Sequence, residues 1–421
     1  MATSSISSTA PIPSPEPRGR VLRRVFKAFG YRDFRIMWIG ACTSSIGTWM
    51  ASLAQAWLVF ELSHSAFYLG LDAFLAQIPI VLFSLIGGVV ADRYERRHML
   101  IMSQVIQMTC AFTLTALFIF GIVHVWQILV LSFFTGFAQS FGGPAYQALI
   151  PSLVKKEDLP NAIALNSIQF NLARVIGPML GGIALTYLGA AWCFGLNGLS
   201  FVAVVFSLLI IHTRYQPLKT GDSVLTSLKQ GISFIRKQPA MVSLIVLAFL
   251  MTALAIPLIV FLPVMAKDVL HGGSLLFTVF LCCSGGGAVC GALVVAFIGH
   301  SKHKGRGALI MLVLLGLLMT GFAQSKSKPL SAILVFVAGA AMIGAIATIS
   351  SLVQLITSDH MRGRVMSVYN VAFRGGMPIG SLVSGSLIPI YSAPLVLATN
   401  GVLLAGLGCY FLLVHRKVAE L

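Results

Sequence analysis

The chain has 421 residues, of which 57% are hydrophobic and only 10% are charged, and its formal net charge at pH 7 is +17. Soluble globular proteins carry roughly 25% charged residues, so the composition excludes that class and indicates an integral membrane protein. A basic protein could bind nucleic acid, but here the lysines and arginines lie in short loops between apolar runs, where membrane topology accounts for them and no nucleic-acid partner is expected.

The first 32 residues precede the apolar runs. Residues 1–17 are rich in Ser, Thr, Pro and Ala and are expected to be disordered. Residues 18–32 predict a basic helix on the membrane surface, because one helical face is apolar and the other carries arginines and a lysine. The apolar residues of that face are Val21, Leu22, Val25, Phe26 and Phe29.

Apolar runs of about 20 residues then recur along the chain, and in hydrocarbon such runs must be helices because every backbone amide needs an internal partner. Twelve spans are predicted, at about 34–60, 67–91, 98–121, 125–150, 162–187, 191–212, 241–266, 273–298, 307–324, 330–356, 365–388 and 393–415.

The distribution of basic residues predicts the orientation of these spans. Of the 29 lysines and arginines, only Lys267, Lys326 and Lys328 lie in odd-numbered loops, while Arg174 and Arg374 lie within spans. By the positive-inside rule, both termini are therefore expected to be cytoplasmic, in the inner (plasma) membrane.

A repeat divides the chain into two halves. The segment 159–182 returns in altered form at 365–380, where Ser367, Arg374 and Pro378 each follow Ser167, Arg174 and Pro178 by 200 positions. The predicted organisation is a first six-helix bundle at 33–212, a cytoplasmic linker at 213–240 with an amphipathic helix, a second six-helix bundle at 241–416 and a tail at 417–421.

The loop after the second span, G-V-V-A-D-R-Y-E-R-R from Gly88 to Arg97, resembles the corresponding motif of the major facilitator superfamily. The matching residues include Gly88, Asp92, Arg93, Arg96 and Arg97, whereas Glu95 stands where the family usually has glycine. The resemblance implies that Asp92 faces the start of the eleventh helix and holds the cytoplasmic side shut, an arrangement that the helix dipole favours. The alternative is a solvated basic loop.

The fifth span carries Gly177, Pro178, Gly181 and Gly182 in a G-P-x-x-G-G pattern. It resembles the motif of the superfamily's proton-coupled exporters, although Ala164 and Ala173 replace two upstream glycines. Glycines allow close helix approach and proline permits a bend, which suits a moving interface. Plain close packing without a role in transport is the alternative.

Further phrases resemble one branch of the superfamily, which includes the enterobactin exporter and the macrolide-efflux transporters. These phrases are F-R-I-M-W-I-G, G-G-P-A-Y-Q-A-L-I-P, L-N-S and R-G-R-V-M-S. The resemblance implies an all-α membrane protein with twelve transmembrane helices in two pseudo-symmetric six-helix bundles.

Arg174 and Arg374 lie near mid-membrane, where a charge is costly, so each is expected to face a cavity or a partner. Asn171, Tyr369 and Asn370 lie within about a turn of them. These residues are candidates for substrate binding or coupling, and structural bonding to backbone carbonyls is the alternative.

Asp72 is the one clear acid within a span. Burial favours the neutral form of a carboxyl group, so Asp72 could carry a proton. Pairing with an arginine and hydration near the outer face are the alternatives.

Together these patterns predict a secondary active transporter, a proton-coupled exporter of a small amphiphilic or anionic molecule such as a siderophore or drug, working as a monomer by alternating access. An importer or lipid flippase of the same fold, or a non-enzymatic sensor, are alternatives. No nucleotide-binding loop, catalytic constellation or metal-ligand cluster is visible, so no cofactor and no enzymatic activity are expected.

Overall fold

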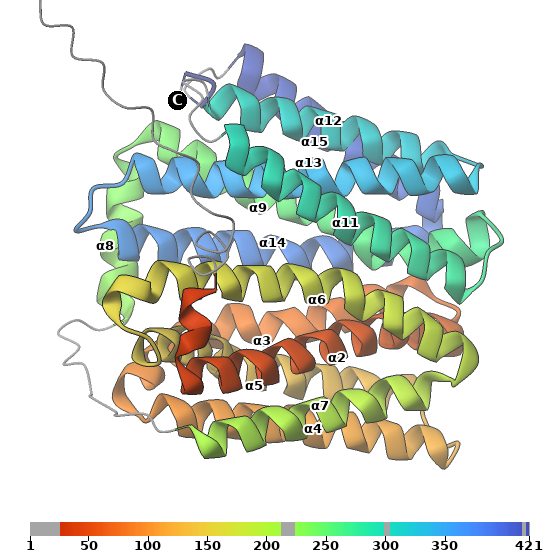
Figure 1. Cartoon of the computed structure of the whole chain (residues 1–421). Helices are drawn as coiled ribbons and strands as arrows, with labels where there is room; N and C mark the ends of the chain where they lie inside the picture. Colours follow the sequence, from red (N-terminus) through yellow and green to blue (C-terminus); the bar gives the residue numbers. More distant parts are fainter. Residues whose placement is uncertain (1–25, 212–223, 299–303, 415–417, 421) are drawn as a thin grey trace, which may run out of the picture.

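The computed structural model describes residues 26–211, 224–298, 304–414 and 418–420, and it contains no strand within these ranges. Twelve long helices dominate the fold (Figure 1), which confirms the predicted all-α class. They are α2 (Arg32–Ser63), α3 (Ala66–Arg93), α4 (Arg96–Ile119), α5 (Val125–Leu149), α6 (Leu159–Tyr187), α7 (Ala190–Ile210), α9 (Pro239–Val260), α11 (Ser274–Ile298), α12 (Lys304–Gln324), α13 (Lys328–Leu355), α14 (Arg362–Tyr391) and α15 (Ala393–Leu413).

Ten of the described helices are long and apolar enough to cross a membrane by length and composition alone. The two remaining long helices, α2 and α14, have the length but carry more polar residues. Their polar side chains are tolerated because both helices pack inside the protein, α2 against α6 and α7, and α14 against α3 and α9.

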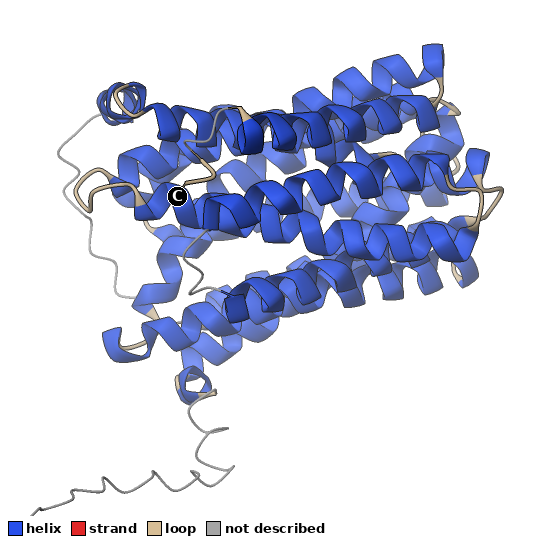
Figure 2. Cartoon of the chain, turned by 90° about the horizontal axis from the view of Figure 1, so that it is seen from above, coloured by secondary structure: helices blue, strands red, loops and turns tan. Residues whose placement is uncertain are grey.

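The helices form two bundles with the same internal packing. In the first, α2 packs against α6 and α7, and α5 packs against α3 and α4. In the second, α9 packs against α14 and α15, and α13 packs against α11 and α12. The fifth helix of each bundle also crosses to the second helix of the other, α6 to α11 and α14 to α3. Two six-helix bundles related by a pseudo-two-fold axis are therefore confirmed (Figures 1 and 2).

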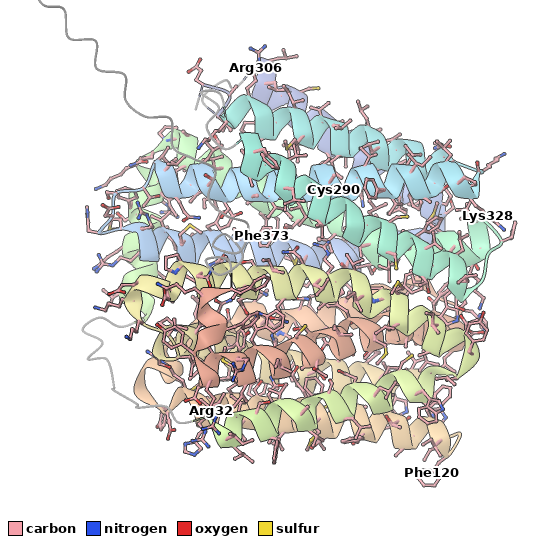
Figure 3. The ribbon with its side chains drawn as sticks, viewed as in Figure 1. Arg32, Phe120, Cys290, Arg306, Lys328 and Phe373 are labelled. Carbon is pink, nitrogen blue, oxygen red and sulfur yellow. The ribbon has the colours of Figure 1, made fainter. Side chains whose placement is uncertain are left out.

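The two ends of the molecule can be distinguished by their segments. We call the end with the start of α2, helix α8 (Val224–Arg236) and the end of α15 the termini side, and the end with the α2–α3 and α14–α15 turns the opposite side. In Figure 3, Arg32 lies at the termini side, and Phe120 and Lys328 lie at the opposite side.

Local sequence signals fix several helix ends. Proline occupies one of the first two positions of α6, α9, α13 and α15, where its missing amide hydrogen is not needed. At the opposite side, His64 takes a left-handed conformation (φ 49°) and ends α2, while Gly189 (φ 91°) allows the turn between α6 and α7. The seventh span continues beyond α9 as a short helix, α10 (Leu262–Val264), and a π-helical turn, η4 (Met265–Val269).

Helix α8 runs across the termini side, roughly perpendicular to the long helices (Figure 1). Gly231 approaches the backbone carbonyl of Arg364 on α14, and Ile235 is buried, whereas Ile232 is exposed. The face of α8 that carries Gly231 and Ile235 therefore packs on the protein, and Ile232 lies outside it. The rest of the predicted linker, 212–223, lies outside the described residues.

The chain enters the first bundle through a 3₁₀ turn, η1 (Lys27–Gly30), which folds back on the start of α6. Asp158, just before α6, accepts hydrogen bonds from Lys27 Nζ at 2.7 Å and Tyr31 Oη at 2.7 Å, and the amide of Ala28 donates to Asn161 Oδ1. The described part of the predicted surface helix, from residue 26 onward, thus begins with a 3₁₀ turn and not with an α-helix. Residues 1–25, which include the rest of that helix and the segment 1–17, lie outside the described ranges.

The ion pair at this turn changes two ionisation equilibria. The hydrogen bond from Lys27, followed by that from Tyr31, lowers the pKa of the Asp158 carboxyl below its ordinary value. The same bond raises the pKa of Lys27. A lowered carboxyl pKa stabilises the fold at pH values above the ordinary carboxyl range, and this contribution disappears as the pH falls through the lowered pKa.

We expect Asp158→Asn to lower the thermal unfolding midpoint in detergent at pH 7, because it removes the charge that holds η1 against α6. The difference from the wild type should disappear in acid, as the wild-type carboxylate becomes protonated. The neighbouring exposed acid gives a matched control, since Glu157→Gln removes a charge without removing either bond. Equal midpoints for Asp158→Asn and Glu157→Gln at pH 7 would contradict the assigned role.

Candidate functional site

The candidate site is built on α6 and α14, the fifth helix of each bundle. On α6, Gly177 lies against Trp49 Cβ, the carbonyl of Ile46 and the amide of Met50 on α2. These close approaches require a glycine, because an added Cβ would meet the backbone of α2.

On α14, Gly376 makes the same three approaches to α9, at Thr252, the carbonyl of Phe249 and the amide of Ala253. Gly177 and Gly376 are thus structural equivalents, and Gly181 and Gly380 form a second such pair. The repeat therefore has an offset of 199 positions in α6 and α14, not the 200 suggested by the matched arginines and prolines.

The corrected register pairs other residues. Phe170 and Tyr369 become equivalent, as do Asn171 and Asn370, whereas Arg174 corresponds to Phe373 and Arg374 to Val175. The two arginines therefore do not occupy symmetric positions. One bundle presents a cation where the other presents an aromatic ring.

Arg174 lies half-buried where α6 crosses α11, and its backbone carbonyl is 2.9 Å from a Cβ placed on Gly285. Its guanidinium carbon lies 5.8 Å from the centroid of the Trp49 ring, and Phe170 meets that ring edge-on at 6.2 Å. Within the described residues, no acidic side chain pairs with it. The exposed apolar surface of α6, at Leu172, Met179 and Ile183, lies on the opposite helical face.

Arg374 shares a face of α14 with Pro378, Ser381 and Gly385, which follow it at helical spacing. Ser381 and Gly385 contact α3, so this face of α14 is directed at the first bundle. Ile379, Val383 and Ile390 form the exposed apolar surface on the other side. Arg374 is itself accessible, and within the described part of the chain it has no carboxylate partner.

The remaining predicted residues near the arginines differ in burial. Tyr369 is 3% exposed, stacks on Phe373 at 5.9 Å between centroids, and its hydroxyl makes no hydrogen bond within the described residues. Asn171 is half-buried and donates to the carbonyl of Ser167 in its own helix, and Asn370 is exposed. Figure 3 marks Phe373 on α14 in the middle of the molecule, between its two ends.

Asp72 is separated from both arginines. It lies on the side of α3 away from Gly70, inside the first bundle, and is 9% exposed. Gln55 Nε2 of α2 donates to both carboxylate oxygens, at 2.9 and 3.1 Å, and the hydroxyl of Ser132 on α5 lies within hydrogen-bonding distance of Oδ1. Neither expected alternative, an arginine partner or hydration near the surface, describes this site.

Close packing of α5 on α3 creates that arrangement. Gly136 lies directly against the carbonyl of Ala76, one turn from the contact between Ser132 and Asp72. Here a small hydroxyl leaves room for the Asp72 carboxyl, which no arginine neutralises.

The G-P-x-x-G-G motif is split between two kinds of contact. Gly177 and Gly181 pack against α2 within their own bundle, and Pro178 is buried. Gly182 instead faces Thr278 of α11, so it lies at the interface between bundles. Gly177 and Gly181 are thus close-packing contacts within a bundle, Gly182 is a contact between bundles, and a role of the motif in transport stays a prediction.

The loop motif is described only in part. Arg96 donates to the carbonyl of Ala148 at 2.9 Å and Arg97 to that of Leu209 at 2.8 Å, which ties the loop to the ends of α5 and α7. A Cβ on Gly88 would meet nothing within 4 Å. The side chains of Asp92 and Arg93 lie outside the described residues, so the proposed latch to the eleventh helix stays a prediction.

Sequence reasoning missed a contact between α3 and α14 toward the opposite side. A Cβ on Gly70 would collide with the carbonyl of Ser381, and one on Gly385 would lie 3.0 Å from the carbonyl of Ala66. Each helix has two small residues four positions apart here, and that spacing is the signal that could have identified the contact. The two bundles are therefore in backbone contact at this level.

Comparison with known proteins gives consistent results. Residues 25–420 match the family model described as transmembrane secretion effector. The chain is 26% identical over 389 residues to the enterobactin exporter EntS of Escherichia coli O1:K1, covering 90% of this chain and 91% of that protein. The EntS of Shigella boydii serotype 18 gives the same identity and coverage.

Two solved structures share the fold. The nucleoside transporter NupG gives a TM-score of 0.71 at 15% identity, over 90% of this chain and 98% of that one. A bacterial homologue of the human lysosomal transporter Spinster, in an inward-facing and unoccupied conformation, gives 0.68 at 14% identity, over 92% and 97%.

We expect Gly70→Ala to destabilise the structure by about 1–3 kcal/mol, because the new methyl group must displace the backbone of α14. Gly88→Ala is the matched control, since the space around Gly88 is open. Thermal unfolding in detergent measures both variants. A Gly70→Ala protein as stable as Gly88→Ala would show that the two backbones do not pack this closely.

Proposed function

The chain belongs to the transmembrane secretion effector family of the major facilitator superfamily, and on that basis we propose that it is a proton-coupled exporter of a small amphiphilic or anionic molecule. The family and the related exporters establish a secondary transporter. The direction of transport, the coupling ion and the class of substrate are the parts that we propose. Siderophores and drugs are the candidate substrates, since the Escherichia coli relative is named for the export of enterobactin.

The observation that carries the substrate class is the pair of mid-helix arginines. Each projects from the side of its helix that faces away from the exposed apolar surface, and no carboxylate within the described residues neutralises either. A guanidinium group in a low-dielectric site favours an anion, and the Trp49 ring beside Arg174, with Phe170 edge-on to it, favours an apolar or aromatic portion.

Transport would proceed by alternating access between domains 33–212 and 241–416, joined by the cytoplasmic linker 213–240. The termini side would face the cytoplasm, as the positive-inside rule predicts. The loop residues Gly88, Asp92, Arg93, Arg96 and Arg97 would control that side. The glycines and proline at 177–182 would let α6 move against α11.

Asp72 is the proposed proton carrier because its surroundings satisfy either protonation state. The Ser132 hydroxyl has a single proton but two acceptors within reach, Asp72 and the carbonyl of Ile128 at 2.9 Å. When Asp72 is ionised, Ser132 donates to it; when Asp72 is protonated, it can donate to Ser132, which then donates to Ile128. Neither state leaves a buried group unpaired.

We expect inverted membrane vesicles with an acidic lumen to accumulate the substrate, because protons leaving the lumen would drive it inward. The probes are enterobactin, erythromycin and a fluorescent phospholipid, which separate siderophore export, drug export and lipid flipping. Asp72→Asn should abolish the response to the pH gradient while preserving substrate exchange at equal pH. The exposed acid Asp268 supplies the control, and Asp268→Asn should respond as the wild type does.

Accumulation that requires an alkaline lumen would identify an importer. Movement of the phospholipid alone would identify a flippase. A gradient response that survives in Asp72→Asn would remove Asp72 from the coupling mechanism.

We expect Arg174→Gln to weaken binding of an anionic substrate by roughly 10- to 100-fold, the range for losing a hydrogen bond to a charged group. Arg174→Lys keeps the charge and should lose less. Arg306→Gln, an exposed residue at the termini side, controls for the change in net charge. Binding is measured by quenching of tryptophan fluorescence, and unchanged affinity with reduced thermal stability would assign Arg174 a structural role instead.

A further inference from the structure

Lys267 is one of the three basic residues that the topology does not explain, and it lies at the opposite side in the second bundle. It belongs to η4, the π-helical turn that extends the seventh span. A π-helical turn adds a residue to the helical repeat and redirects the side chains that follow, and such turns are frequent at functional sites.

The Lys267 side chain reaches across to the first bundle. Its ammonium nitrogen lies 5.7 Å from the ring centroid of Trp57 and 5.7 Å from that of Phe60, both on α2. The same nitrogen is 3.9 Å from Glu61 Oε1, also on α2, and the side chain is 30% exposed. Three contacts, two with rings and one with a carboxylate, therefore hold this residue of the second bundle against α2 of the first.

Neighbouring contacts close the same end of the molecule. Trp57 stacks on Phe277 of α11, with ring centroids 6.1 Å apart and planes inclined by 20°. The hydroxyls of Thr186 on α6 and Ser274 on α11 are 3.3 Å apart. Trp57 thus contacts both Lys267 and Phe277 of the second bundle, so separating the bundles at this side must break both contacts.

We propose that Lys267 is a positioning residue for transport, a latch that holds the opposite side closed and is released when that side opens. This proposal rests on the alternating-access cycle proposed above. It does not depend on the direction of transport, the coupling ion or the substrate. A lysine suits a reversible contact, because its ammonium group is stabilised by the rings when the side is closed and by water when it is open. Purely apolar side chains would not be stabilised by water when the side opens.

The test measures the opening of this side directly with two spin labels. Phe120→Cys, at the end of α4, and Leu330→Cys, at the start of α13, carry the labels in a protein whose seven native cysteines are replaced by serine. Electron–electron double resonance then gives the populations of molecules with a short distance between the labels (closed) and with a long one (open). In Lys267→Met, the ratio of open to closed populations should rise roughly tenfold, the shift expected for losing these cation–ring contacts.

Two further variants control for charge and for fold. Lys267→Arg keeps a cation over the rings and should stay close to the wild-type ratio. Lys326→Met removes the same charge from an exposed position at the same side and should leave the ratio unchanged. The latch is overturned if Lys267→Met leaves the ratio at the wild-type value or if Lys326→Met raises it equally.

The same data separate this inference from the proposed function. If an open population exists but is the same in the wild type and in Lys267→Met, the latch is overturned and alternating access is not. If every variant shows only the short distance between the labels, with substrate present or absent, both the latch and alternating access are overturned.

Discussion

The structure depends on one constraint: a guanidinium group carried into the membrane by a helix must face the interior of the protein. Insertion scales put the cost of a mid-membrane arginine at about 2.5 kcal/mol or more. Here α6 solves the problem by approaching α2 so closely that Gly177 contacts the backbone, which brings the Trp49 ring under Arg174. The glycine motif and the arginine are therefore parts of one arrangement, since the close helix approach supplies the ring that the cation needs.

The helices could be predicted from the sequence, because a segment that spans a membrane must be an apolar run of sufficient length. Hydrophobic length determines the helices, and the family resemblance supplied their pairing into bundles. The register of the repeat was wrong by one, because matching Arg174 to Arg374 and Pro178 to Pro378 compared residue types. The contacts that define equivalence are those of Gly177 and Gly376 with neighbouring helices, and a sequence does not state which neighbour each glycine meets.

The partners of Asp72 were beyond prediction for a similar reason. Gln55 and Ser132 lie on different helices, and only the approach of α5 to α3 at Gly136 brings them to the carboxyl group. The one signal in the sequence is that the second span, 67–91, contains Asp72 but no lysine or arginine. A missing cation near an acid predicts that neutral donors surround it, but the side of α3 that carries Asp72 had to come from the structure.

The corrected register gives the two bundles different chemistry at equivalent places. Arg174 in one corresponds to Phe373 in the other, while Phe170 and Tyr369 keep an aromatic ring at the preceding position and Asn171 and Asn370 an amide. A duplicated scaffold thus retains the rings and amides on both sides but carries its arginines at unequal positions. A molecule between the bundles would meet an arginine on each wall, but at positions that are not equivalent, so the two walls would present different patterns of charge and aromatic rings to it. In the proposed cycle, pseudo-symmetry would supply the two conformations, and the unequal positions of the arginines would orient the substrate.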